Sequence, residues 1–459
     1  MLRSTLWVVP LGLAGALTWL ACSGPEGPTG EIGVPGEAGA PGAMGAIGAT
    51  GATGPQGPTG PGGTQAGDGG TSLGDGGVVG IPVSCLSPCH GFNGVVSQFQ
   101  SSVHYAAYLA NVSSPTPEAA WTTPGAACGN CHAIDALAQR VAGNVATVDG
   151  GVVANLASGE LEYRNPANNA LASANYAGSA TVAEVYCTTC HAVTNANDPH
   201  KTGATWTPGS FPLVVDADGG SVNIERSPSN AAVTGTAAGN FGPGDTCMWC
   251  HRSRTDVTNM LAPTGNKITS VFWGPHEGPQ ADLFTGTGGY EYAGKAYGQA
   301  THEQKLSCID CHMVSVTENA GVPDHSFAPQ LAACKSCHAT ATTFDVNGFE
   351  SQIKSAMTQI QTWFNQQGFL TRSSSAPYTP LTAAQLGDGN WDQDLPVPGA
   401  SIDGGLLTQD QAGALYNYIT VARGGAYGVH NPKYVAQILY DSYFALTGLP
   451  LAAFPQRPQ

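Results

Sequence analysis

The sequence predicts a mainly α-helical fold with extensive irregular loops, preceded by an extended N-terminal stalk. Three observations support this prediction. Six short motifs of cysteine and histidine in the middle of the chain have the spacing of a single helical turn. The C-terminal part contains amphipathic segments bounded by helix-capping residues. The chain also has 62 glycines among 459 residues and only 10% charged residues, which favours irregular backbone between short helices.

At the N-terminus, residues 1–21 are predicted to be a signal peptide of the lipoprotein type. Arg3 supplies a positive charge ahead of an apolar stretch, Leu6 to Leu20, that is short for a membrane span. Residues 21–24 resemble a bacterial lipoprotein cleavage site, which implies acylation of Cys22. Simple secretion with cleavage nearby is the alternative. Either way we expect an exported protein, placed at the outer membrane or cell surface as a lipoprotein, or in the periplasm.

Residues 22–80 are predicted to be a collagen-like stalk followed by a glycine-rich linker. From Gly24 to Gly60 every third residue is glycine, thirteen in succession. Only glycine fits at the axis of a collagen triple helix, so this period is typical of a trimerising stalk. A single chain cannot form that helix, and a disordered spacer is the alternative. The run from Gly62 to Gly80 is predicted to be a flexible linker.

Residues 81–345 contain six motifs in which a histidine directly follows the second of two closely spaced cysteines. Five have the spacing Cys-x-x-Cys-His, and the first has one additional residue between its cysteines. In chain order the cysteine pairs are Cys85 and Cys89, Cys128 and Cys131, Cys187 and Cys190, Cys247 and Cys250, Cys308 and Cys311, and Cys334 and Cys337. The histidines that follow them are His90, His132, His191, His251, His312 and His338.

This spacing is the signature of covalent haem attachment. Residues i, i+3 and i+4 of a helix share one face, so two thiols can bond the two vinyl groups of one haem while the imidazole binds its iron. Cysteines at i and i+4, as in the first motif, also share a face. Zinc sites use paired cysteines too, but zinc gives no reason for a histidine after every second cysteine. We therefore predict six covalently bound haem c groups, and no thiol left for a disulfide besides Cys22.

Six further histidines are predicted to bind the same irons from the opposite, distal side. They are His104, His200, His276, His302, His325 and His430. Six irons with one proximal imidazole each need six more ligands, and the two numbers match. A surface or core position is the ordinary role of any one of these histidines taken alone. Methionine is the other candidate ligand, and Met260 is the well-placed one. The sequence does not indicate which histidine serves which iron.

Residues 346–459 are predicted to be a helical region that contributes one distal ligand. The predicted starts and ends are Asn347 with Glu350 as a capping box for a helix to about Gln367, Thr408 with Gln411 for a helix to about Ala422, and Asn431 with Pro432 for a helix that stops at Gly448. The apolar face of the first helix is Ile353, Met357, Ile360 and Phe364.

On its six motifs, the region 81–345 resembles the multihaem c-type cytochromes. The resemblance implies a multihaem cytochrome c fold organised around six haems. It extends to the hexahaem outer-surface cytochromes of metal-respiring bacteria, some of which polymerise into conductive filaments. The segment from Arg423 to Pro432 resembles the C-terminal ligand segment of the multihaem nitrite reductase and octahaem cytochrome group, which implies that His430 is a haem ligand.

These observations predict electron transfer by an exported conduit, with extracellular acceptors as one destination. An iron held by two imidazoles has no open position for a substrate, which favours a carrier without substrate turnover. The alternative is a multihaem oxidoreductase that reduces nitrite, hydroxylamine or tetrathionate at one open haem. The nitrite reductases carry lysine in place of the proximal histidine at their catalytic haem, and no Cys-x-x-Cys-Lys motif occurs here.

The net charge of −16 limits the partners that we expect. With only 16 Lys and Arg residues, the chain lacks the basic patches that nucleic acid binding requires. An acidic surface favours basic redox proteins or cationic electron acceptors. A lipid at Cys22 would attach the chain to a membrane. Self-association is expected either as a trimer through the stalk or as a filament.

Overall fold

The computed structural model describes about three fifths of the chain, and its N-terminal region is not among the described parts. The predicted signal peptide, Cys22, the stalk, and the first two motif cysteines, Cys85 and Cys89, all lie outside the described residues. The residues described are His90, 94–106, Trp121, Gly125, 128–142, 144–146, 152–153, 162–164, 171–173, 175–178, 184–201, 211–215, 242–255, 257–298, 300–315 and 322–459.

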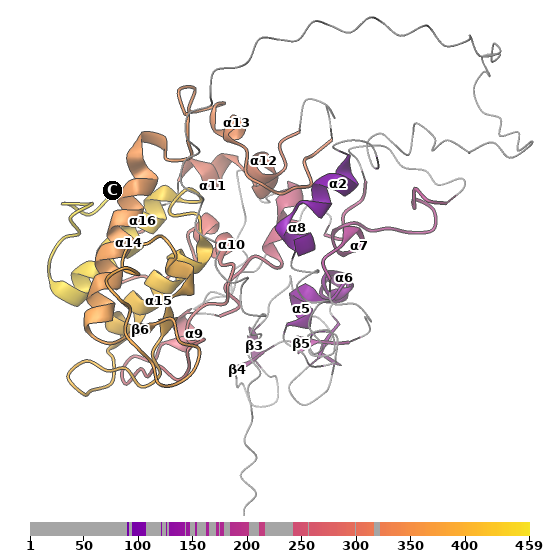
Figure 1. The fold of residues 1–459 in the computed structure, drawn as a ribbon. Coiled ribbons are helices and arrows are strands. Elements are labelled where there is room, and N and C mark those ends of the chain that lie inside the picture. The colour runs from indigo at the N-terminus through magenta and orange to yellow at the C-terminus, as the bar shows by residue number, and fades with distance from the viewer. Residues whose placement is uncertain are drawn as a thin grey trace, which may run out of the picture.

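The described chain is mostly helical with long connecting loops, as predicted, and it has two parts. Three long helices gather at the C-terminal side, and short helices carrying the motifs lie beside them (Figure 1). The short helices are α2 (Val95–Gln100), α5 (Gly129–His132), α6 (Ala136–Val141), α7 (Cys187–Cys190), α8 (Asp245–Met248), α9 (Val257–Met260), α10 (Gln280–Thr285), α11 (Thr301–Lys305), α12 (Cys308–His312) and α13 (Leu331–Cys334). Single 3-10 turns are η3 (Gly242–Gly244), η5 (Val346–Gly348) and η6 (Trp391–Gln393).

The three long helices, α14 (Phe349–Gln366), α15 (Gln409–Gly424) and α16 (Pro432–Thr447), form the main hydrophobic core. The apolar face expected of the first is confirmed, because Ile353, Met357 and Ile360 are 0% exposed and Phe364 is 1% exposed. α15 packs against both α14 and α16 and is buried almost throughout. The apolar interior of this C-terminal bundle contains no motif cysteine or histidine, although residues of the preceding region, such as Trp273 and Leu283, also pack into it.

Two of the three predicted helix caps are confirmed. The Thr408 side chain accepts a hydrogen bond from the Gln411 amide at 3.2 Å, while the Gln411 side chain accepts one from the Thr408 amide at 3.0 Å. Asn431 accepts a hydrogen bond from the Tyr434 amide at 3.2 Å, with Pro432 at the first helical position. Both helices end at a left-handed glycine. The capping residues thus define these two boundaries locally, before any tertiary packing.

The cap predicted for α14 is wrong. The helix follows Gly348 in the left-handed conformation, and Asn347 has a φ of 56°, so its side chain does not cap the helix. Asp345 supplies the cap instead: it accepts hydrogen bonds from the Ser351 amide at 3.2 Å and from the Ser351 hydroxyl at 2.5 Å. Glu350 pairs with Lys354 at 2.6 Å. A left-handed turn between the acid and the helix hides this cap from a search by spacing.

Among the described residues, the β-structure consists of short antiparallel pairings. β1 (Val145–Ala146) pairs with β2 (Val152–Val153) and β5 (Asn175–Tyr176), β3 (Glu162–Arg164) with β4 (Leu171–Ser173), and β6 (Leu370–Thr371) with β7 (Leu395–Pro396). Tyr176 of β5 is 1% exposed, and its hydroxyl donates to Asp135 at 2.5 Å. A Cβ at Gly129 would lie 2.6 Å from the Tyr176 ring, so this strand packs tightly on the turn that holds the second motif.

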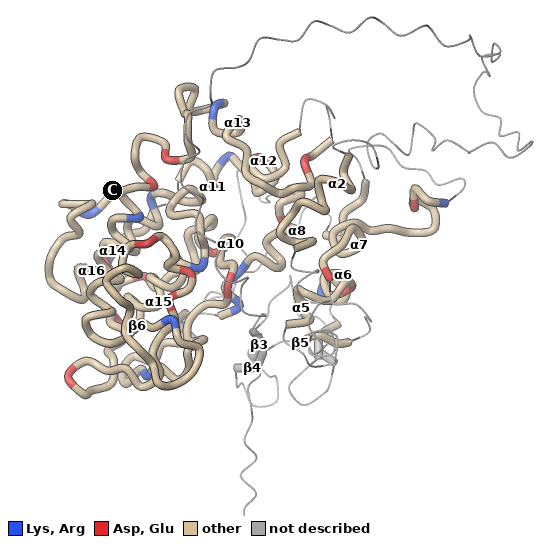
Figure 2. Tube along the Cα trace, viewed as in Figure 1, with Lys and Arg blue, Asp and Glu red and all other residues tan. Residues whose placement is uncertain are grey.

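Charged side chains are sparse over both parts of the described chain (Figure 2). Within those residues, no helix combines the length and the apolar character needed to cross a membrane.

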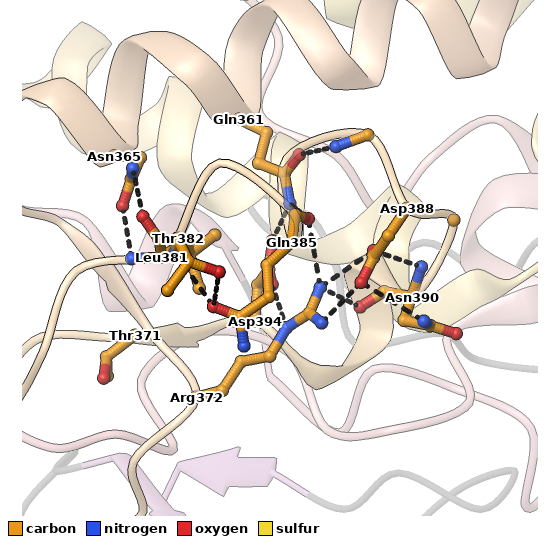
Figure 3. Close-up of polar contacts among 12 residues, drawn as sticks. Gln361, Asn365, Thr371, Arg372, Leu381, Thr382, Gln385, Asp388, Asn390 and Asp394 are labelled. Atoms are coloured by element: carbon orange, nitrogen blue, oxygen red, sulfur yellow. Dashed lines mark hydrogen bonds and ion pairs between the residues drawn. The ribbon is translucent and has the colours of Figure 1, made fainter. Parts of the chain in front are cut away.

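A buried ion-pair network joins α14, α15 and the loop after η6 (Figure 3). Asp394, whose side chain is 0% exposed, receives hydrogen bonds from Arg372 Nε at 3.0 Å, Gln361 at 2.6 Å and the Tyr418 hydroxyl at 2.6 Å. The Arg372 guanidinium also makes two bonds to Asp388, at 2.7 and 3.0 Å. Burial raises the pKa of Asp394, and these donors oppose that rise. The network closes the end of the bundle with its polar groups satisfied.

We expect Arg372→Gln to destabilise the bundle by about 3 kcal/mol, because Asp394 would lose its countercharge and keep two neutral donors. Urea unfolding followed by far-UV circular dichroism measures the loss. Lys354→Gln is the matched control: it breaks a partly exposed ion pair with Glu350 and should cost about 0.5 kcal/mol or less. The double variant Arg372→Gln, Asp394→Asn should recover part of the loss. Equal effects of the two single changes would contradict the assignment.

Candidate haem-binding site

Each described motif forms one helical turn that places its histidine over the first cysteine. The hydrogen bonds from the histidine amide to the carbonyl of that cysteine are His132 to Cys128 at 3.1 Å, His191 to Cys187 at 2.8 Å, His251 to Cys247 at 2.9 Å and His338 to Cys334 at 2.7 Å. The fifth motif is helix α12 itself, with Ser307 and Asp310 forming a capping box at its start. Cysteines and histidine therefore share one face of each turn, as expected from the spacing.

Five of the six motif histidines have their rings beside the ring of a histidine from outside the motifs. The pairs, with the distance between ring centres, are His90 and His200 at 6.1 Å, His251 and His104 at 5.9 Å, His191 and His325 at 6.2 Å, His338 and His302 at 6.3 Å, and His312 and His430 at 6.3 Å. Each of the five contains one motif histidine and one further histidine, and no histidine occurs twice.

This separation fits two imidazoles on opposite sides of one iron. Metal–imidazole bonds are about 2 Å long and an imidazole nitrogen lies about 1 Å from its ring centre, so the two ring centres should be about 6 Å apart. Packed aromatic rings such as Phe364 and Phe369, 5.8 Å apart, span the same range of separations. The distance is therefore informative here because each pair joins one motif histidine to one further histidine. Within the described residues, no group of three or more His, Cys, Asp or Glu side chains could hold a metal ion. Imidazole pairs suit an iron that takes its other four ligands from a porphyrin.

Hydrogen bonds fix the tautomer of many of these rings. Acceptors lie within reach of Nδ1 in His191 (Pro212 O, 3.3 Å), His200 (Asp198 Oδ1, 3.2 Å), His251 (Gln280 Oε1, 3.1 Å), His276 (Glu277 O, 2.8 Å), His302 (Val429 O, 2.7 Å), His312 (Phe327 O, 2.9 Å) and His325 (Pro323 O, 2.8 Å). A carbonyl or carboxylate oxygen can only accept, so Nδ1 carries the proton and the Nε2 lone pair is free to bind a metal.

Burial keeps several of these histidines neutral, which is the form that binds a metal. Burial lowers the pKa of His104 to about 4, with the charge of His251 adding to the effect. Burial likewise lowers the pKa of His276 to about 3 and that of His430 to about 4. These imidazoles are therefore unprotonated at neutral pH.

The C-terminal bundle positions His276 through Arg423, at the end of α15. The Arg423 guanidinium donates to the carbonyl of Pro275 and pairs with Glu277 at 2.9 Å, so it binds the residues on both sides of the histidine. The His276 amide donates to Ser253 O at 2.7 Å, just beyond the fourth motif. Arg423 is 6% exposed. Sequence reasoning missed this arginine, since nothing in its local pattern indicates a partner far away in the chain.

The loop between α15 and α16 positions two more of the six histidines. Val429 O accepts from His302, which lies 127 residues earlier in the chain, and His430 follows directly. The His430 ring lies just ahead of the capping residue Asn431, which is 0% exposed, so the start of α16 fixes its direction. His430 Nδ1 is buried without a hydrogen-bond partner. Three of the six non-motif histidines thus depend on α15 and α16.

The remaining histidines, His132 and His276, form no ring contact with each other. The His132 ring packs on Trp121, and the charge of His132 is among the groups that lower the pKa of His276, so the two lie in the same region. Met260, the alternative ligand, packs against the hydrophobic core of the C-terminal bundle.

The state of one motif cysteine, Cys128, differs from the prediction. Nine of the described motif cysteines are free thiols: Cys131, Cys187, Cys190, Cys247, Cys250, Cys308, Cys311, Cys334 and Cys337. Cys128 is disulfide-bonded in the structure, although the sequence left no thiol for a disulfide. A sulfur in a disulfide cannot also form a thioether to a vinyl group, so at this position only the reduced thiol fits the haem-binding motif.

Comparisons with known proteins agree with the motif pattern. The chain is 22% identical over 293 residues to the C-type polyheme cytochrome OmcC of Geobacter sulfurreducens, and 25% identical over 299 residues to OmcB of the same species. Each match covers 56% of this chain and 36% or 37% of the relative, so the chain spans just over a third of their length. No protein-family model matches.

A solved structure, that of the outer cell wall cytochrome OcwA, superposes with a TM-score of 0.39 at 16% identity, over 77% of this chain and 50% of that one. The Cys-x-x-Cys-His turns and the similarity to the two polyheme cytochromes point to the same class of protein. The chain thus resembles the multihaem c-type cytochromes in its motifs and in its sequence.

Proposed function

We propose that this cytochrome is an electron conduit with six covalently bound haems, each iron held between two histidines. The observation that carries the proposal is the set of five imidazole pairs, 5.9 to 6.3 Å apart, each with one motif histidine. The proposed axial pairs are those five together with His132 and His276. The proximal ligands are the motif histidines, and the motif cysteines, Cys85, Cys89 and Cys128 among them, are the attachment sites.

The haem supplies an iron that accepts and releases one electron, and the protein keeps that iron's surroundings constant. Two imidazoles of fixed tautomer serve as ligands in both oxidation states, so little has to move when an electron arrives. His302 and His276 are fixed by Val429 and Arg423, which belong to a rigid bundle. With both axial positions taken, the protein excludes substrates from the metal.

The proposed location is the cell exterior or periplasm. Attachment of haem c to an exported chain agrees with the signal peptide predicted over residues 1–21. Cys22 is the proposed lipid anchor, and residues 24–60 act as a spacer that holds the haem region away from the membrane or joins three copies. The acidic composition favours basic redox proteins or cationic extracellular acceptors as partners.

The alternative function, an oxidoreductase with one open haem, would most naturally use the haem of the second motif. His132 is the motif histidine whose ring faces a tryptophan and no second imidazole among the described residues. Were one iron to keep an open position, it would be this one. The charge of His132 is among the groups that lower the pKa of His276, which supports His276 as the ligand at that position and favours the conduit.

Six haems are expected in the mature protein. Intact mass after denaturation counts them, because the thioether bonds survive unfolding. The mass should not change with a reducing agent, since Cys128 would be in a thioether and not in a disulfide. A count of five with a reducible Cys128 would show that the second motif does not bind haem. A count of five with Cys128 modified points instead to the wider spacing of Cys85 and Cys89.

Carbon monoxide separates the conduit from the enzyme. We expect the reduced protein to show no change in its haem absorption bands on addition of the gas, and the oxidised protein to show no high-spin iron by electron paramagnetic resonance (EPR). Stoichiometric binding at one haem, with turnover of nitrite or hydroxylamine, would overturn the conduit. In that case His276→Ala should leave the binding unchanged, because His276 would not be a ligand of the open haem.

Arg423→Gln should free the loop that carries His276 and render part of one haem high-spin. A charge-assisted hydrogen bond contributes about 1.5–3 kcal/mol, enough to compete with ligand binding by a loosened loop. Arg457→Gln is the matched control, because Arg457 pairs with Asp441 of the same bundle at 2.8 Å. It should lower the urea midpoint without a spectral change. Equal spectra for both variants would remove Arg423 from the role of a positioning residue.

A further inference from the structure

Phe327 contacts histidines of three different pairs. Its ring centre lies 4.9 Å from that of His104 and 5.9 Å from that of His325. Its carbonyl oxygen accepts the Nδ1 hydrogen bond of His312 at 2.9 Å. Phe327 has a φ of 56°, a left-handed conformation that is unfavourable for a large side chain. The surrounding structure holds this residue in place at the expense of backbone strain.

The fourth motif, Cys247 to His251, contacts the second motif through Arg140. This buried guanidinium lies over the Trp249 ring, with 5.2 Å to its centre, and donates to Trp249 O at 2.6 Å. The same nitrogen lies 3.9 Å from Cys131 Sγ. The same nitrogen also donates to Asn130 O of the second motif at 3.4 Å. The attachment sites of these two motifs are therefore immediate neighbours.

The fourth motif also contacts the fifth. Cys308 packs against the apolar cluster that contains Met248 and Trp249. A Cβ at Gly244, directly before α8, would lie 3.2 Å from the Cys308 amide nitrogen. The starts of α8 and α12 thus approach each other at a position where no side chain fits.

We propose that the haem sites form a branched array, with the site of His104 and His251 at the branch point and Phe327 as a positioning residue there. This inference rests on the proposed function. The branch site contacts the His132 site through Arg140 and the His312 and His430 site through Cys308. It meets the His191 and His325 site through the ring of Phe327.

A branch gives an electron at the central site more than one way out. In a linear row a single damaged or oxidised site stops transfer, whereas in a branched array the other arms stay connected. The sites at the ends of the array also have different surroundings. The His302 and His338 site lies beside the C-terminal bundle, and the His191 and His325 site lies on the side of α2 and α7. One cytochrome could therefore exchange electrons with two partners, or with two copies of itself.

EPR of partly reduced protein tests the arrangement by counting neighbours. Low-spin ferric irons broaden the signals of adjacent haems, and this broadening vanishes when one iron becomes diamagnetic on reduction. His104→Met should raise the potential of the central haem, so that it takes the first electron. The signals of three other haems should then sharpen together. His302→Met is the matched control. When the haem of His302 and His338 takes the first electron in that variant, the signal of one other haem should sharpen. If the signals of two haems or fewer sharpen in His104→Met, the proposed branch point is wrong.

A second variant does not depend on methionine acting as a ligand. Phe327→Gly removes the ring while glycine adopts the same backbone conformation freely, so the bond from His312 to the carbonyl is retained. The g values of two haems, those of His104 and His325, should shift. Phe211→Ala is the control, since the Phe211 ring centre lies 5.4 Å from that of His191. It should shift the g values of one haem, that of His191. A shift of one or none in Phe327→Gly would overturn the assignment. Carbon monoxide binding by the unaltered protein would instead contradict the proposed function alone.

Discussion

The separation between two imidazole rings is the constraint on which the rest of this molecule depends. A pair has to be kept about 6 Å apart without collapsing into direct contact, and each ring has to present its Nε2. Neither demand is met by the rings themselves. Backbone carbonyls such as Pro323 O and Val429 O fix the tautomers, and helix ends and short loops fix the directions. Much of the irregular backbone in the motif region holds these imidazole rings, which explains why so small a share of that region is regular helix.

The C-terminal bundle contributes rigidity where the motif region has little. Its interior is closed by the buried Asp394 network and by the caps of α15 and α16. Because its core needs no histidine or cysteine, the bundle can act as a reference frame. Arg423 and Val429, at one end of that frame, hold His276 and His302, and His430 lies beside the motif histidine His312. The two parts of the described chain are thereby linked through single residues as well as by packed surfaces.

The sequence was informative wherever the signal is local. One turn of helix for each motif follows from spacing, and the starts of α15 and α16 follow from capping residues. The six further histidines could be named by elimination. Their pairing could not be predicted, because His191 and His325, or His104 and His251, meet only through tertiary structure. The cap of α14 was misassigned because Asp345 acts across a left-handed turn at Gly348. Arg423 and Phe327 were missed because an arginine or a phenylalanine has too many ordinary roles to stand out alone.

The position of α15 and α16 at the end of the chain has a consequence for the order of assembly. A chain that is exported from its N-terminus presents all six motifs before these two helices emerge. On the proposed ligand set, the sites of His132, His312 and His338 would then have their cysteines and proximal histidines long before Arg423, Val429 and His430 are present to complete them. Attachment of cofactor and completion of coordination are thus separated in time for half of the sites. A chain truncated before residue 409 could therefore carry all of its haems and still have incomplete coordination at half of the proposed sites.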